Sequence, residues 1–136
     1  MIEDLLADLK RDEGFRSKPY LDTVGKVTIG YGRNLDDVGL SEREGRFLLG
    51  NDLDVALGEL DRNVPWWRAM PDPAQRGLAN MCFNLGFPRL NGFRNMLAAL
   101  EDGRYQDAAV AALDSRWARQ VGDRAKRIAS LYRQCE

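Results

Sequence analysis

The sequence predicts an α+β protein that is mostly helical, with a small antiparallel β-sheet near its N-terminus. Two observations support this prediction. Short β-type runs broken by glycine are confined to residues 15–38, and amphipathic helical patterns fill the chain before and after that stretch. The length of 136 residues fits one domain, residues 1–136, which can bury a core without disulfides or metal.

The first helix is predicted from an apolar stripe with the i, i+3, i+4, i+7 spacing of one buried helix face: Ile2, Leu5, Leu6 and Leu9. At about 100° per residue, Glu13 falls in the middle of this stripe. Gly14 follows and is a natural residue just past a helix end, so we expect Glu13 at the negative end of the helix dipole, against apolar neighbours. Both surroundings favour a protonated carboxyl, as a general acid requires.

The clearest β pattern spans residues 26–31. Its alternation places Val27, Ile29 and Tyr31 on one face of the strand and Thr28 on the other. Thr28 is therefore expected to point away from the apolar side.

Capping residues and prolines predict the remaining helices. Ser41 and Glu44 form a capping box, and the helix that follows, at about residues 41–62, must stop before Pro65. We expect this long helix to join two lobes. The pattern beyond it is helical, with helices from Asp72-Pro73 to near Gly86, from Asn91 to near Gly103, and a final two separated by Gly122-Asp123.

The most specific motif combines Glu13-Gly14 with the run YLDTVGKVTIGYG at residues 20–32, which contains Asp22 and Thr28. In residue type and spacing it resembles the bacteriophage-type lysozymes, a glycoside hydrolase family in which a helix ending in Glu-Gly precedes a hairpin reading Asp-Thr-x-Gly-x-x-Thr-Ile-Gly. Later segments follow the family's order, so that the resemblance covers nearly the whole chain: residues 80–86, 108–109, 115–117 and 124–127.

The resemblance implies a lysozyme-like fold and a muramidase. The sheet lobe is expected at about residues 12–40, and the helical lobe at about 63–136, packed with the helix 1–13. A polysaccharide would lie between the lobes. The implied reaction is hydrolysis of the β-1,4 bond between N-acetylmuramic acid and N-acetylglucosamine in bacterial peptidoglycan, by an endolysin that lyses the host cell wall.

The same resemblance assigns the catalytic residues. Glycoside cleavage needs a proton for the leaving oxygen and an anionic group near the sugar carbon that is attacked. The family pattern makes Glu13 the acid, Asp22 the second carboxylate and Thr28 a residue that holds the attacking water, with inversion at that carbon. From the residues alone, Asp22 could equally be a turn residue that binds nearby backbone N–H groups, and Thr28 a β-former on a solvent face.

Further residues are implied to support the site. Arg124 matches the family arginine that pairs with Glu13, and Arg33 and Asp52 are expected to form an ion pair between the sheet lobe and the long helix. Arginine at this position would bring no titration near neutral pH, unlike histidine. Phe83 is as consistent with a core position as with sugar binding. The candidate substrate-binding residues are Leu35, Phe83, Asn84 and Arg116.

Composition excludes several classes of protein. The net charge of −1 does not fit a nucleic-acid-binding domain. The chain has no histidine, and cleavage by two carboxylates needs no metal or cofactor. Cys82 is expected to be buried and Cys135 to be an exposed thiol. No signal peptide or membrane-inserting segment is predicted, so we expect a monomer in the cytoplasm of the producing bacterial host that reaches the wall through a holin-type pore.

Two other functions fit parts of the sequence. A wall-binding module would keep the fold without turnover, but it has no chemical need for Glu13, Asp22 and Thr28 together. A helical DNA-binding protein is suggested only by the basic segment between Asp114 and Glu136, and the near-neutral overall charge argues against it.

Overall fold

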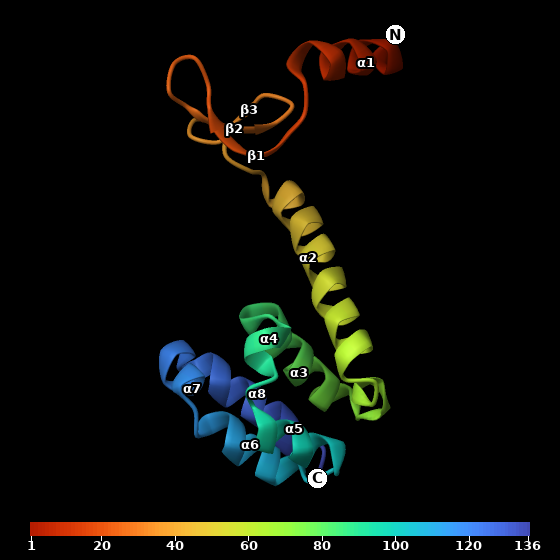
Figure 1. The fold of residues 1–136 in the computed structure, drawn as a ribbon, viewed down its shortest axis with the longest axis vertical. Helices are drawn as coiled ribbons and strands as arrows, with labels where there is room; N and C mark the ends of the chain where they lie inside the picture. The colour runs from red at the N-terminus through yellow and green to blue at the C-terminus, as the bar shows by residue number, and fades with distance from the viewer. The chain divides into compact units, whose positions relative to one another are not determined.

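The computed structural model describes residues 1–136, which divide into two compact units, Met1–Leu48 and Leu49–Glu136 (Figure 1). It confirms the predicted α+β class, with a small antiparallel sheet and a majority of helix. The helices and strands are α1 (Ile2–Glu13), β1 (Arg16–Leu21), β2 (Val27–Gly30), β3 (Arg33–Asn34), α2 (Glu42–Asn63), the 3₁₀ helix η1 (Trp67–Ala69), α3 (Asp72–Leu85), α4 (Phe87–Leu90), α5 (Arg94–Glu101), α6 (Tyr105–Leu113), α7 (Arg116–Val121) and α8 (Asp123–Arg133).

Helix α1 ends at Glu13 as predicted, and Gly14 follows with a φ of 69°. Within the first unit no residue of α1 is buried, so its apolar stripe has no packed partner there. Leu5 and Leu9, for example, are 43% and 45% exposed. A helical period identifies the face that can be buried, whereas burial also needs a packed partner, and the sheet of the first unit does not cover this face. Packing of residues 1–13 with the helical lobe stays a prediction.

The sheet is antiparallel with the strand order β1-β2-β3, so β2 is the central strand (Figure 1). Thr28 lies at the middle of the sheet, opposite Tyr20 on one side and Asn34 on the other. It is only 3% exposed, while Val27 and Ile29 are half-buried. Thr28 is therefore more buried than its apolar neighbours in β2, at the centre of the sheet with its hydroxyl hydrogen-bonded to the Lys26 carbonyl.

The N-terminus of α2 carries the predicted capping box. Ser41 Oγ accepts a hydrogen bond from the Glu44 backbone N–H at 3.1 Å, and Glu44 Oε1 accepts one from the Ser41 N–H at 2.9 Å. The helix ends at Asn63, just before Pro65, as expected.

The second unit holds the hydrophobic core, formed mainly where α3 and α6 pack on α8 and where α5 packs on α6 (Figure 1). The predicted helix from Asp72 to Gly86 is confirmed as α3, and Gly122 separates α7 from α8. The helix expected from Asn91 begins at Arg94 instead. Residues 87–90 form the short helix α4, and Gly92 and Phe93 close its end through backbone bonds to Arg89 and Leu90.

The cysteines and the most deeply buried tyrosine belong to this second unit. Cys82 is buried as predicted, and burial raises the pKa of its thiol to about 11. Cys135 is half-buried rather than exposed, because it packs against the core beside the end of α8. The Tyr132 hydroxyl is fully enclosed and donates to Met81 Sδ at 3.3 Å.

None of the helices is both long enough and apolar enough to span a lipid bilayer.

Candidate active site

The candidate catalytic residues Glu13, Asp22 and Thr28 all lie in the first unit. Glu13 is the last residue of α1, at the end where the helix carbonyls are unpaired. Within the first unit its side chain is exposed. The burial expected from its place in the apolar stripe stays a prediction, since a carboxylate in a stripe is desolvated only when a partner packs on it.

Asp22 lies at the start of the turn between β1 and β2. Its Oδ1 accepts hydrogen bonds from the backbone N–H groups of Val24 and Lys26, both at 2.9 Å. The turn role is thereby established for this side chain. Its other oxygen, Oδ2, accepts no hydrogen bond from the protein, so the turn holds the carboxylate in place and leaves one oxygen for chemistry.

Thr28 is joined to the same turn. Its Oγ1 donates to the Lys26 carbonyl at 2.9 Å. The backbone of Lys26 thus binds both candidate residues, since its N–H reaches Asp22 and its C=O reaches Thr28. Because the hydroxyl proton is committed to the backbone, Thr28 can act toward a water molecule only as an acceptor.

Arg33 pairs with Glu44, which the sequence predicts only as a member of the capping box. Its Nη1 donates to Glu44 Oε1 at 2.8 Å and to the Gly39 carbonyl at 3.1 Å, and its Nη2 pairs with Glu44 Oε2. The capping box accounts for this pair, because it holds the Glu44 carboxylate at the N-terminus of α2 beside the end of the sheet. The predicted pair of Arg33 with Asp52, which belongs to the second unit, stays a prediction. The Arg33 guanidinium and the Ser41 groups lower the pKa of Glu44 to about 2.

A groove of 580 Å³ in the second unit contains two of the predicted residues, Phe83 and Arg124. Phe83 is 40% exposed on its wall, which places it outside the core. Arg124 donates from Nε to Asn80 Oδ1 at 2.9 Å, which links α8 to α3. Its pairing with Glu13 stays a prediction. The groove is lined by Leu49, Leu53, Leu57, Trp67, Gln75, Arg76, Ala79, Asn80, Phe83 and Arg124.

The other candidate binding residues have different surroundings. Asn84 Oδ1 accepts from the indole N–H of the buried Trp117 at 2.8 Å, so its oxygen has a structural role. Arg116 is exposed at the first turn of α7. Leu35 is half-buried just after β3 and donates its backbone N–H to the Val27 carbonyl at 2.7 Å. Leu35 belongs to the first unit, and Asn84 and Arg116 belong to the second.

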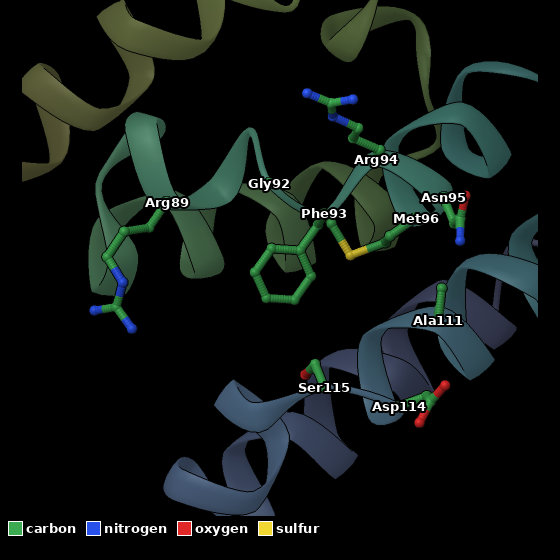
Figure 2. A pocket seen from close by; sticks show the side chains of 9 residues that line it. All are labelled: Arg89, Gly92, Phe93, Arg94, Asn95, Met96, Ala111, Asp114 and Ser115. Atoms are coloured by element: carbon green, nitrogen blue, oxygen red, sulfur yellow. The ribbon is translucent and has the colours of Figure 1, made fainter.

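A second pocket in this unit, of 380 Å³, was not predicted (Figure 2). It lies between residues 89–96 and residues 111–115. Figure 2 shows the Phe93 ring between these two walls, with Arg94 turned away from Asp114 and Ser115. No local sequence signal marks this pocket, because it exists only where two segments distant in the chain pack beside each other.

Comparison with known proteins identifies the family. The family model described as phage lysozyme matches residues 10–135. The chain belongs to the phage lysozyme family. The matched span includes Glu13, Asp22 and Thr28, and the membership confirms the resemblance seen in the sequence and supports a glycosidase of the lysozyme type.

Individual members resemble the chain to different extents. The pre-baseplate central spike protein Gp5 of Enterobacteria phage T4 is 31% identical over 151 aligned positions, which cover 90% of this chain and 26% of that protein. Two probable T4-type lysozymes of Dictyostelium discoideum are 26% and 25% identical, over 97% and 96% of this chain and 95% and 94% of their own lengths. The chain therefore spans about a quarter of the spike protein and nearly all of the two lysozymes.

Proposed function

We propose that this protein is a muramidase that hydrolyses the β-1,4 bond between N-acetylmuramic acid and N-acetylglucosamine in bacterial peptidoglycan. The observation that carries the proposal is the placement of two carboxylates in unlike surroundings within one unit of a phage lysozyme family member. Glu13 ends a helix, and Asp22 is held by two backbone N–H groups in a turn. Such contrasting surroundings suit an acid and an anionic partner.

The proposed reaction is a single displacement. Glu13 gives its proton to the glycosidic oxygen as the bond from that oxygen to the muramic acid carbon breaks. A water molecule attacks the same carbon from the opposite face, and its proton passes to Asp22. The free Oδ2 of Asp22 is the oxygen placed to accept it, because Oδ1 is occupied by the turn. Thr28 holds the water by accepting one of its hydrogen bonds. The product has inverted configuration.

The proposed biological role is lysis of the host wall by a phage or prophage endolysin. The protein would accumulate as a monomer in the cytoplasm of the producing bacterium and reach peptidoglycan through a holin-type pore. Similarity to a T4 spike protein favours a second role, wall cutting by a virion component. Detection of the protein in purified virions would support the virion role, and its presence only in the lysate would support the endolysin.

The test compares wild type with Glu13→Gln on outer-membrane-permeabilised Gram-negative cells. Glu3→Gln is the matched control, because Glu3 is an exposed acid on the same helix, in its first turn. We expect wild type and the control to clear the cells and Glu13→Gln to fail. Mass spectrometry of the released fragments should find reducing muramic acid ends.

Other outcomes would contradict the proposal in distinct ways. Anhydro ends on muramic acid would indicate a transglycosylase. Binding to walls without clearing by wild type would indicate a wall-binding module. Retention on DNA that falls steeply with added salt, without clearing, would indicate a nucleic-acid-binding protein.

A further inference from the structure

The Glu13 carboxylate lies directly against Gly32, in the segment that joins β2 to β3. A Cβ atom built on Gly32 would lie 2.9 Å from Glu13 Oε2 and 3.5 Å from its Cδ. The first distance is too short for two atoms that are not bonded, and the second is an ordinary van der Waals contact. A side chain at position 32 would therefore occupy space that the carboxylate now uses. Among the glycines of the chain, only Gly32 has the Glu13 side chain as its neighbour.

Two features accompany this contact. Gly30 and Gly32 have φ values of 70° and 81°, in the left-handed region that glycine adopts without strain. The Tyr31 ring contacts the Phe15 ring at a centroid distance of 5.3 Å and an interplanar angle of 52°. Phe15 follows Glu13 by two residues, and Tyr31 precedes Gly32 by one. The aromatic pair therefore fastens the end of α1 to the turn that carries Gly32.

We infer that Gly32 is a positioning residue for Glu13: its missing side chain leaves the space in which the carboxyl group of the proposed acid is seated. The inference rests on the proposed muramidase function for its catalytic meaning, but the contact itself does not. A methyl group at position 32 would meet the far end of a flexible side chain, which can rotate away. The fold should therefore survive, while the carboxyl group leaves its place.

The variant Gly32→Ala adds a methyl group next to Glu13 and also places an alanine in the left-handed backbone region, which costs stability by itself. Two control variants separate these two effects. Gly103 has a φ of 74° in the second unit, and an added Cβ there meets nothing within 4 Å. Gly30, two residues before Gly32, also meets nothing within 4 Å. Gly103→Ala and Gly30→Ala therefore carry the same kind of backbone penalty without touching Glu13. We expect similar drops in melting temperature for the three variants.

The first measurement is the NMR resonance of the Glu13 side-chain carboxyl carbon, in protein labelled with ¹³C-glutamate and assigned by its loss in Glu13→Gln. We expect this resonance to move in Gly32→Ala and to stay near its wild-type position in Gly30→Ala and Gly103→Ala. An unmoved resonance in Gly32→Ala would overturn the inference. So would a Gly32→Ala protein that fails to fold while both controls fold, because the position would then serve the backbone.

The second measurement is muramidase kinetics on soluble peptidoglycan fragments across pH. Misplacing an acid by about 1 Å can cost on the order of 100-fold in rate, so we expect Gly32→Ala to lose about that factor in kcat with KM near wild type. Its pH–rate profile should also shift, which a loss of folded protein alone would not produce. Equal kcat and pH profile in Gly32→Ala and Gly30→Ala would overturn the inference. A moved resonance in a protein whose wild type lacks activity would instead overturn the proposed function and leave the contact standing.

Discussion

Arg33 and Glu44 form a two-point ion pair in which both terminal guanidinium nitrogens meet the carboxylate. The same carboxylate accepts the Ser41 backbone N–H and so caps α2. One side chain therefore closes the helix end and fastens it to β3. Bidentate geometry suits arginine and would be lost with lysine, whose ammonium is a single point charge.

Glu44→Gln should lower the melting temperature at neutral pH and lose this effect in acid. The pKa of Glu44 is lowered to about 2, first by its hydrogen bond from Arg33. A carboxyl whose folded pKa lies below its unfolded value, about 4.3, stabilises the fold above the unfolded pKa and loses that contribution as pH falls through the folded one. We expect the gap in melting temperature between wild type and variant to be full above about pH 5 and to close toward pH 2.

Asp52→Asn is the control for this pair, because Asp52 was the partner expected from the sequence. With Glu44 as the partner, Asp52→Asn should leave the melting temperature unchanged from pH 5 to 8. A loss with Asp52→Asn that matches the loss with Glu44→Gln would restore the sequence-based assignment.

Asp22→Asn should separate the turn role of this residue from its proposed catalytic role. Asparagine keeps a side-chain oxygen that can accept the N–H groups of Val24 and Lys26, so the turn should persist and the melting temperature should change little. The lost charge should reduce kcat by about 100-fold or more, as expected for removal of a general base. Asp22→Ala, which removes both roles, should also lower the melting temperature. Full activity of Asp22→Asn would exclude Asp22 as the proton acceptor.

Asn84→Ala should lower the stability of the fold more than it weakens substrate binding. Removing the amide leaves the indole N–H of buried Trp117 without its partner, which costs about 1–3 kcal/mol of unfolding free energy. Phe83→Ala, one position earlier on α3, should show the opposite balance, because Phe83 is 40% exposed on the wall of the groove. We expect a raised KM and a smaller stability loss for Phe83→Ala, measured by kinetics and urea unfolding. A larger stability loss from Phe83→Ala than from Asn84→Ala would place Phe83 among the packing residues.

Gly77→Ala should destabilise the second unit although alanine is the better helix former. An added Cβ would lie 2.7 Å from Tyr132 Cε1, and the Tyr132 ring is enclosed and has no room to move. Overpacking of this kind typically costs about 1–3 kcal/mol, which exceeds the propensity gain. Gly50→Ala, in α2, meets nothing within 4 Å and should instead gain about 0.5–1 kcal/mol. Equal effects of the two substitutions in chemical denaturation would show that the contact with Tyr132 is relieved without cost.

The sequence alone determined the features that depend on neighbouring residues. The end of α1 at Glu13, the Ser41–Glu44 capping box, the stop of α2 before Pro65 and the span of α3 were all predicted, because helix caps and proline act within a few residues of where they stand. The family motif was also readable, since its residue types and spacing lie in one short run.

Tertiary structure decided what each side chain meets. It gave Arg33 the partner Glu44, buried Thr28 in the central strand, paired the Asn84 oxygen with the Trp117 indole N–H and brought the Glu13 carboxylate against Gly32. Periodicity and spacing describe one element at a time, whereas hydrogen-bond partners, burial and steric contacts arise between residues that only the folded backbone brings within a few ångströms.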